Sequence, residues 1–276
     1  MIRSVNPEWD TSEHQWHYNK IKAEKFIYQN STYENVIVGS SLSTRLIMRD
    51  LPNNFYNLSF GGQSIYDGLE ILKRSDKQPK KIFIEINVLF KPMNDAFIQS
   101  LFNPVLRAAK EQLPIMKSQN QPIGIIGNNM HVRRFVFHLL NGYQTVMRKI
   151  GGYNPANAAG TLAGEMDFML EQQMDAYRHL PDKEMIFKSI TLLSEYVSIF
   201  KHRGIQVAFF EMPVHPKLAD QKRAVETRKI INTYFGKERI IPQPNCHEYG
   251  TTDGVHLNLE SARKYTVYLK NRILQL

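Results

Sequence analysis

Short apolar segments that each lead into small or polar residues most constrain the fold of this 276-residue chain. They have strand length, and segments with apolar residues at helical spacing follow several of them. Strands that alternate with helices predict a parallel sheet with helices on both faces. The segments predicted as strands are residues 35–39, 54–60, 80–90 and 204–214, with a weaker pattern at 239–242.

The predicted helices differ in how clearly their apolar residues repeat. In the segment 64–75, Ile65, Leu69 and Leu72 recur at helical spacing. The other helices are predicted around 18–29 and over 131–150, 183–202 and about 259–274. We therefore expect an α/β fold with a three-layer α/β/α arrangement.

A long stretch separates the third predicted strand from the fourth. We interpret residues 91–182 as a helical insertion within one domain that covers residues 1–276. Its segment 131–150 forms the clearest helix, and that helix is basic. A basic amphipathic helix can lie on a membrane surface, but its apolar residues more commonly belong to a core beneath a solvated basic face.

Composition excludes several classes of protein. The single cysteine, Cys246, permits no intrachain disulfide, and no apolar run is long enough to span a bilayer. The first twenty residues lack the apolar core of a signal peptide, although the chain could be the soluble part of a longer anchored protein. A net charge of +9 suits an anionic polymer or surface, but no nucleic-acid-binding motif accompanies it, so we expect no nucleic acid partner.

Polar residues collect where the predicted strands end. Ser41, Gly62 and Asn87 follow the first three strands, and Asp253 and His256 precede the last predicted helix. The carboxyl ends of parallel strands share one edge of a sheet, so these residues are expected to converge there.

Each of these residue types has a role in acyl transfer. A serine hydroxyl becomes a strong nucleophile when an imidazole takes its proton, and a carboxylate orients that imidazole. Asp253 is three residues before His256 and can reach its ring within one turn. The N–H groups of Ser41 and Gly62 and the side-chain amide of Asn87 are the candidate oxyanion-hole donors.

In these residues the chain resembles the SGNH, or GDSL-like, hydrolase superfamily. That family has a serine in G-D-S-L, then a glycine, an asparagine in G-x-N-D, and D-x-x-H near the C-terminus. The matching residues, in the same order, are Gly39-Ser40-Ser41-Leu42, Gly62, Asn87, and Asp253 with His256. The resemblance covers about residues 35–90 and 183–276 and leaves the insertion out. It implies a flavodoxin-like sheet, catalysis by Ser41, His256 and Asp253, and no cofactor.

Two positions depart from the family pattern. Ser40 replaces its aspartate, and Glu85-Ile86-Asn87-Val88 keeps only its asparagine. Such forms resemble divergent members that act on acylated cell-surface polymers as esterases or O-acyltransferases. The resemblance therefore implies an O-acyl substrate, with an O-acetylated carbohydrate polymer favoured, and it favours an envelope or secreted location. A transferase would also need an acyl donor, for which a membrane partner protein is one source.

Other interpretations stay open. Each motif alone is compatible with an ordinary turn or cap, and a non-catalytic binding or assembly subunit could keep the same fold. Glu211 and His215 follow the fourth strand and are candidate substrate contacts, although a loop histidine is more commonly ordinary surface. His14 and His17 have possible metal-ligand spacing without a third ligand, so no metal is expected.

Overall fold

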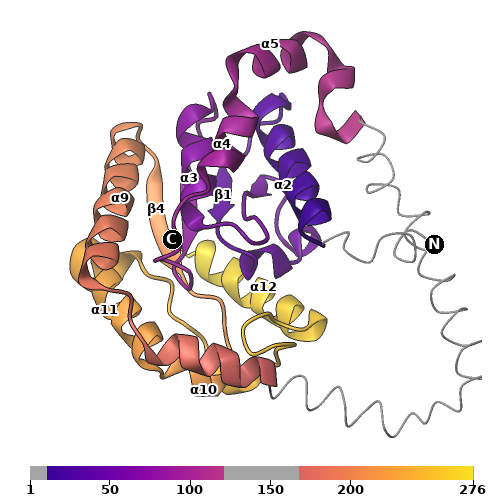
Figure 1. The fold of residues 1–276 in the computed structure, drawn as a ribbon. Helices are drawn as coiled ribbons and strands as arrows, with labels where there is room; N and C mark the ends of the chain where they lie inside the picture. Colours follow the sequence, from indigo (N-terminus) through magenta and orange to yellow (C-terminus); the bar gives the residue numbers. More distant parts are fainter. Residues whose placement is uncertain (1–10, 121–167, 276) are drawn as a thin grey trace, which may run out of the picture.

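The computed structural model describes residues 11–120 and 168–275. Within these ranges the chain forms a four-stranded, entirely parallel sheet with strand order β2-β1-β3-β4 (Figure 1). The strands are β1 (Asn35–Val38), β2 (Phe55–Asn57), β3 (Lys81–Glu85) and β4 (Gln206–Phe210). The mixed α/β fold with a parallel sheet agrees with the sequence prediction.

Both faces of the sheet are buried. Along β1, Val36 and Val38 belong to one apolar cluster and Ile37 to another, because successive side chains point to opposite faces. In β3, Ile84 and Phe83 alternate in the same way. Near-continuous apolar strands are typical of a sheet covered on both sides.

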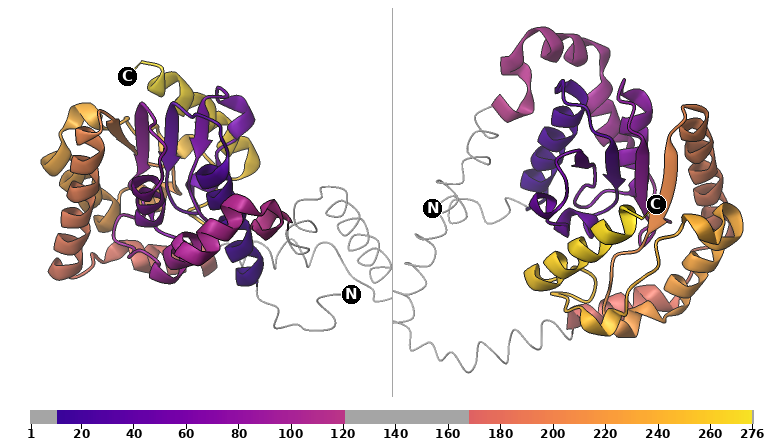
Figure 2. Two further views of the ribbon diagram at one scale, coloured as in Figure 1. Left: turned by 90° about the horizontal axis from the view of Figure 1, so that it is seen from above. Right: turned by 180° about the vertical axis from the view of Figure 1, so that it is seen from behind.

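Helices and loops supply the rest of both clusters. Two further views show that helices lie on both sides of the sheet (Figure 2). One face carries α2 (Thr11–Tyr28), α3 (Ile65–Arg74), α4 (Asp95–Phe102) and α9 (Lys183–His202). The other face carries α10 (Pro216–Ala219), α12 (Leu259–Ile273) and a helical segment at 168–178. The helix α11 (Lys222–Phe235) contributes Ala224 to this second cluster and Ile231 to the first.

Local sequence explains where several helices begin. Ser64 and Asp67 form a capping box at α3, and Asn258 caps α12 by accepting the Ser261 N–H. The helix α5 (Pro104–Gln112) starts with a proline after the capping residue Asn103. None of the described helices is long and apolar enough to cross a membrane.

Several sequence predictions differ in extent from the structure. The third strand was predicted over 80–90 but pairs only to Glu85, and the weak strand at 239–242 is reduced to one bridge between Ile240 and Phe209. The helix α11 has no counterpart among the predicted helices. The predicted helix at 131–150 lies outside the described residues, so the helical insertion is described only through 95–120 and 168–178.

Candidate active site

The serine after β1 meets the histidine before α12. Ser41 Oγ lies 2.8 Å from His256 Nε2, although 215 positions separate the two residues in the chain. Asp253 Oδ2 lies 2.6 Å from His256 Nδ1 on the other side of the ring. The structure therefore brings these three sequence-predicted residues together in the order hydroxyl, imidazole, carboxylate.

A tight turn holds the aspartate and the histidine. Asp253 Oδ1 accepts the N–H groups of Val255 at 3.1 Å and His256 at 2.8 Å. Gly254 has a φ of +92°, which favours glycine, and its carbonyl accepts the His215 N–H at 2.7 Å. The turn is fixed by its own backbone, so the carboxylate is oriented before any substrate arrives.

Asp253 is suited to remain ionised. Partial burial raises the pKa of its carboxyl, but hydrogen bonds from the His256 backbone, the His256 ring and the Val255 N–H outweigh this effect. The pKa of Asp253 therefore lies below its ordinary value. An ionised carboxylate at Nδ1 keeps the imidazole in the tautomer whose Nε2 can accept the Ser41 proton.

Two of the three predicted oxyanion donors have no competing acceptor among the described residues. No hydrogen bond within the described residues uses the N–H of Ser41 or of Gly62. Gly62 has a φ of +69°, and its carbonyl accepts a hydrogen bond from Lys91 Nζ at 2.6 Å. Both amides are therefore without an acceptor within the described residues, and their role as oxyanion donors stays a prediction.

The loop before Gly62 rests on α2. Asn19 donates to the Gly61 carbonyl at 2.8 Å and accepts the Gly61 N–H at 3.2 Å. A Cβ added at Gly62 would lie 3.1 Å from Gln15 Oε1. Packing against α2 thus restricts the path of the Gly61–Gly62 backbone.

The side-chain amide of Asn87, unlike the backbone N–H groups of Ser41 and Gly62, already has partners in the protein. Its Nδ2 donates to the Met212 carbonyl at 2.9 Å, and its Oδ1 accepts the Met212 N–H at 2.8 Å. This pair fixes the orientation of the amide and ties the end of β3 to the end of β4. One N–H of Nδ2 remains for an oxyanion, so the predicted role stays a prediction.

Glu211 is buried, and its carboxylate is already paired within the protein. Its buried carboxylate accepts from Arg228 Nε at 2.7 Å, and its carbonyl accepts from the Tyr265 hydroxyl at 2.7 Å. Burial raises its pKa, which the paired Arg228 opposes. This pairing favours a structural role over the predicted substrate contact.

His215 remains beside the candidate site. It is partly exposed, and its Nδ1 accepts the Lys217 N–H at 3.3 Å at the start of α10. Its backbone bond to Gly254 places it next to the turn of Asp253 and His256. Partial burial, followed by nearby Lys217 and His247, lowers the pKa of the His215 imidazole.

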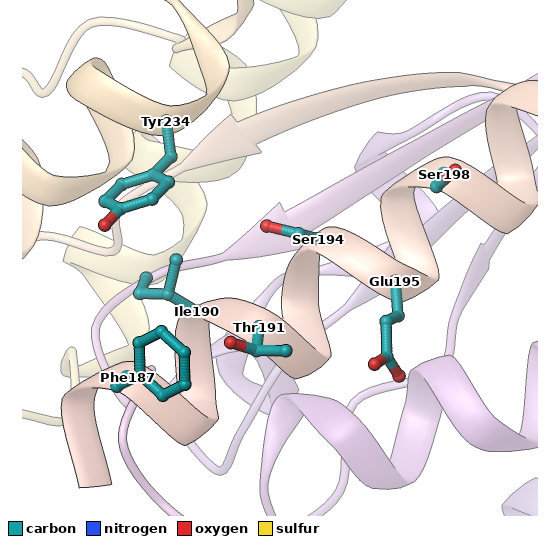
Figure 3. Close-up of a pocket in the computed structure, with 7 residues that line it drawn as sticks. All are labelled: Phe187, Ile190, Thr191, Ser194, Glu195, Ser198 and Tyr234. Atoms are coloured by element: carbon teal, nitrogen blue, oxygen red, sulfur yellow. The ribbon is translucent and has the colours of Figure 1, made fainter. Parts of the chain in front are cut away.

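A groove elsewhere on the molecule contains none of the predicted site residues. It has a volume of about 390 Å³ and lies between α9 and α11, where Tyr234 faces Phe187 and Ile190 (Figure 3). Its other lining residues are Thr191, Ser194, Glu195 and Ser198. No group of three or more metal-ligating side chains occurs in the described ranges.

Sequence reasoning missed the residue that holds the serine loop. Glu85 is fully buried and accepts hydrogen bonds from both Ser40 and Ser43. An acidic residue inside the apolar segment 80–90 was the available signal, because glutamate is rarely buried without partners.

Comparisons of the chain with protein-family models, curated proteins and solved structures found no match. The functional interpretation therefore depends on the four sequence blocks and on the geometry of the residues that they contain.

Proposed function

We propose that this chain is a serine-dependent ester hydrolase or O-acyltransferase of the SGNH type. The observation that carries the proposal is the continuous contact from Ser41 Oγ to His256 Nε2 and from His256 Nδ1 to Asp253 Oδ2, at 2.8 and 2.6 Å. The strand order also fits the flavodoxin-like sheet that the SGNH resemblance implies.

The first half-reaction forms an acyl-enzyme. Ser41 Oγ attacks the ester carbonyl while His256 Nε2 takes the serine proton, and the carbonyl oxygen becomes an oxyanion. The N–H groups of Ser41 and Gly62 donate to this oxyanion, with the free N–H of Asn87 as a third donor. The tetrahedral intermediate then collapses, and His256 gives its proton to the departing alkoxide.

The second half-reaction reverses these roles. His256 takes a proton from water or from a sugar hydroxyl, and the resulting oxygen nucleophile attacks the acyl carbon. Collapse of the second intermediate returns the proton to Ser41 Oγ. Water yields a free acid and a sugar hydroxyl yields a new ester, so hydrolysis and transfer use the same residues.

An O-acylated carbohydrate polymer is the substrate we favour. The side chains of His256 and Asp253 are 22% and 24% exposed, so the relay lies near the surface, where a bulky substrate can reach it. The charge of +9 also suits an anionic polymer. Both features are compatible with a small ester as well, and the polymer preference derives from the resemblance.

Labelling of Ser41 tests the proposal. A fluorophosphonate should modify the protein once, at Ser41, and the same protein should cleave an aryl acetate. Ser41→Ala should remove labelling and lower kcat by at least about 10³-fold, because the nucleophile is lost. Absence of labelling, together with unchanged cleavage in Ser41→Ala, would contradict the proposal and favour the non-catalytic binding subunit.

Competition between water and a glycan hydroxyl for the acyl group distinguishes a hydrolase from a transferase. The aryl acetate is supplied with and without a soluble glycan, and acetylated sugar and free acetate are both measured. A hydrolase yields acetate at the same rate in both reactions. A transferase diverts the acetyl group to the glycan.

A further inference from the structure

The buried carboxylate of Glu85 lies directly beneath the nucleophile loop. Glu85 is the last residue of β3, and 0% of it is exposed. No lysine, arginine or histidine forms an ion pair with it among the described residues. A buried carboxylate without a cationic partner is costly unless hydrogen bonds replace its hydration.

Two serines supply those hydrogen bonds. Oε2 accepts the N–H groups of Ser40 at 2.9 Å and Ser43 at 3.1 Å, and it also accepts the Ser43 hydroxyl. Oε1 accepts the Ser40 hydroxyl at 2.7 Å. Burial raises the pKa of Glu85, and these four hydrogen bonds oppose that rise by favouring the carboxylate.

The same contacts determine which amides of the loop remain available. The N–H groups of Ser40 and Ser43 bind Glu85, and the Leu42 N–H binds Ser40 Oγ at 3.2 Å. Ser41 lies between these positions, and its N–H has no acceptor within the described part of the chain. The Glu85 carboxylate thus fixes the loop on both sides of Ser41. The Ser41 N–H is left without a partner among the described residues and is available to a bound substrate.

Gly39 makes room for this arrangement. A Cβ at residue 39 would lie 2.6 Å from Glu85 Oε2 and 2.5 Å from Ser43 Oγ. Both distances are shorter than packed atoms tolerate, so the glycine allows the carboxylate and the serine hydroxyl to approach the backbone.

We propose that Glu85 is a positioning residue that orients the Ser41 hydroxyl toward His256 and the Ser41 N–H toward the oxyanion. The proposal rests on the proposed function of Ser41 as a nucleophile. Glu85 itself does not touch the substrate in this role. It acts through Ser40 and Ser43, and its effect should therefore fall on the transition state more than on substrate binding.

The test compares the full chain with three variants by kcat and KM for an aryl acetate, rate of fluorophosphonate labelling, and Tm. Glu85→Met keeps the approximate length of the side chain but replaces both carboxylate oxygens with a weakly accepting thioether. Glu85→Gln keeps one oxygen for the two backbone N–H groups. Ser43→Ala removes a single hydroxyl contact and remains informative if Glu85→Met does not fold.

Glu24→Gln is the matched control. Glu24 is also buried and accepts the N–H and hydroxyl of one serine, Ser118, but its other partner is Lys110. These residues belong to α2, α5 and the short turn at 118–120 (Ser118–Asn120). The control should lower Tm and leave kcat and the labelling rate unchanged.

We expect Glu85→Met to lower kcat and the labelling rate by about 10²-fold, the effect of misplacing one oxyanion donor, with KM within about threefold of wild type. Glu85→Gln should recover only about a tenth of wild-type kcat, and the kcat of Ser43→Ala should fall between those of Glu85→Met and Glu85→Gln. Wild-type kcat in Glu85→Gln and Ser43→Ala, with Tm reduced as in the control, would overturn the positioning role. A wild-type chain that neither labels nor cleaves ester would instead overturn the proposed function, and with it this role.

Discussion

At the scale of single residues, Asp253 is held in place mainly by residues next to it in the sequence. Its two carboxylate oxygens bind separate groups of His256, the ring and the backbone N–H. The contact arises within four consecutive residues and needs no help from other strands. For this reason the D-x-x-H spacing allowed the Asp253–His256 contact to be expected from sequence.

Asp253→Asn tests this orientation. An asparagine is similar in size but can present its NH₂ group to Nδ1, which stabilises the tautomer that cannot accept the serine proton. We expect kcat for an aryl acetate to fall by about 10²- to 10⁴-fold with little change in Tm. Steady-state kinetics with thermal denaturation measures both. Full activity would remove Asp253 from the relay.

Other residues of the site depend on neighbours that sequence spacing does not reveal. Glu85 binds the loop after β1, and Asn87 binds Met212 after β4, because β3 lies between those two strands in the sheet. Strand order is a property of the folded chain, so the partners of Glu85 and Asn87 could not be read from their positions. The pairing of the buried Glu211 with Arg228 was hidden for another reason, because Arg228 lies on α11, a helix that was not predicted.

At the scale of elements, the loop between β2 and α3 carries a conformational requirement. Gly62 has a φ of +69°. Gly204, which links α9 to β4, has a similar φ of +74°. A Cβ at Gly204 would meet no atom within 4 Å. Gly204 therefore provides a control in which backbone conformation alone is perturbed.

Gly62→Ala should lower both stability and activity. A left-handed backbone costs an alanine roughly 1–2 kcal/mol, so Gly62→Ala and Gly204→Ala should each lower the free energy of unfolding by about that amount. Only Gly62→Ala should lower kcat, by about tenfold or more, because it displaces an oxyanion donor. Denaturant titration measures the free energy of unfolding of each variant, and steady-state kinetics measures its kcat. Equal kcat in the two variants would argue against a role for the Gly62 amide.

The packing of α2 on the end of β2 predicts a pH-dependent stability. Lys22 Nζ donates to the Ser59 carbonyl at 2.7 Å, and burial lowers the pKa of Lys22 from 10.5 to about 7. Between these values the unfolded chain binds more protons than the folded chain. The contribution of Lys22 to stability therefore rises as the pH rises through this range and is smallest at and below pH 7.

Lys22→Met isolates this contribution. The free energy of unfolding of wild type minus that of the variant should increase between pH 7 and pH 10, with a slope of up to about 1.4 kcal/mol per pH unit for one proton. Urea denaturation at several pH values measures it. A difference that is constant over this range would show that Lys22 titrates normally in the folded chain.

The limits of the elements were harder to predict than their existence. Apolar residues continue past the end of β3 at Ile86, whose N–H still donates to Phe210, and at Leu89, which lies in a turn. Both are buried, so the segment looked longer than the strand. The helix α11 has only three buried residues, Ala224, Thr227 and Ile231, among many charged ones. Its apolar pattern was therefore too sparse to indicate a helix.

At the scale of the whole molecule, one sheet separates two apolar clusters. Ile37 of β1 lies in one cluster and Ile84 of β3 in the other, and both are completely buried. Each strand contributes to both clusters, because its side chains alternate between faces. The two clusters should therefore unfold together, as expected for the single domain predicted from sequence.

Ile37→Ala and Ile84→Ala test this coupling. Each should lower the free energy of unfolding by about 2–5 kcal/mol, the usual cost of such a cavity. In differential scanning calorimetry both variants should keep one transition, with matching calorimetric and van't Hoff enthalpies. A second transition in either variant would show that the two faces form separate folding units.

The 215 positions between Ser41 and His256 also bear on biosynthesis. The ribosome reaches His256 only 215 residues after it has added Ser41. A chain released between these two points would contain the Ser41 hydroxyl but lack the His256 imidazole. The ester chemistry proposed for this serine would thus begin only after His256 has been synthesised and has folded against the serine loop.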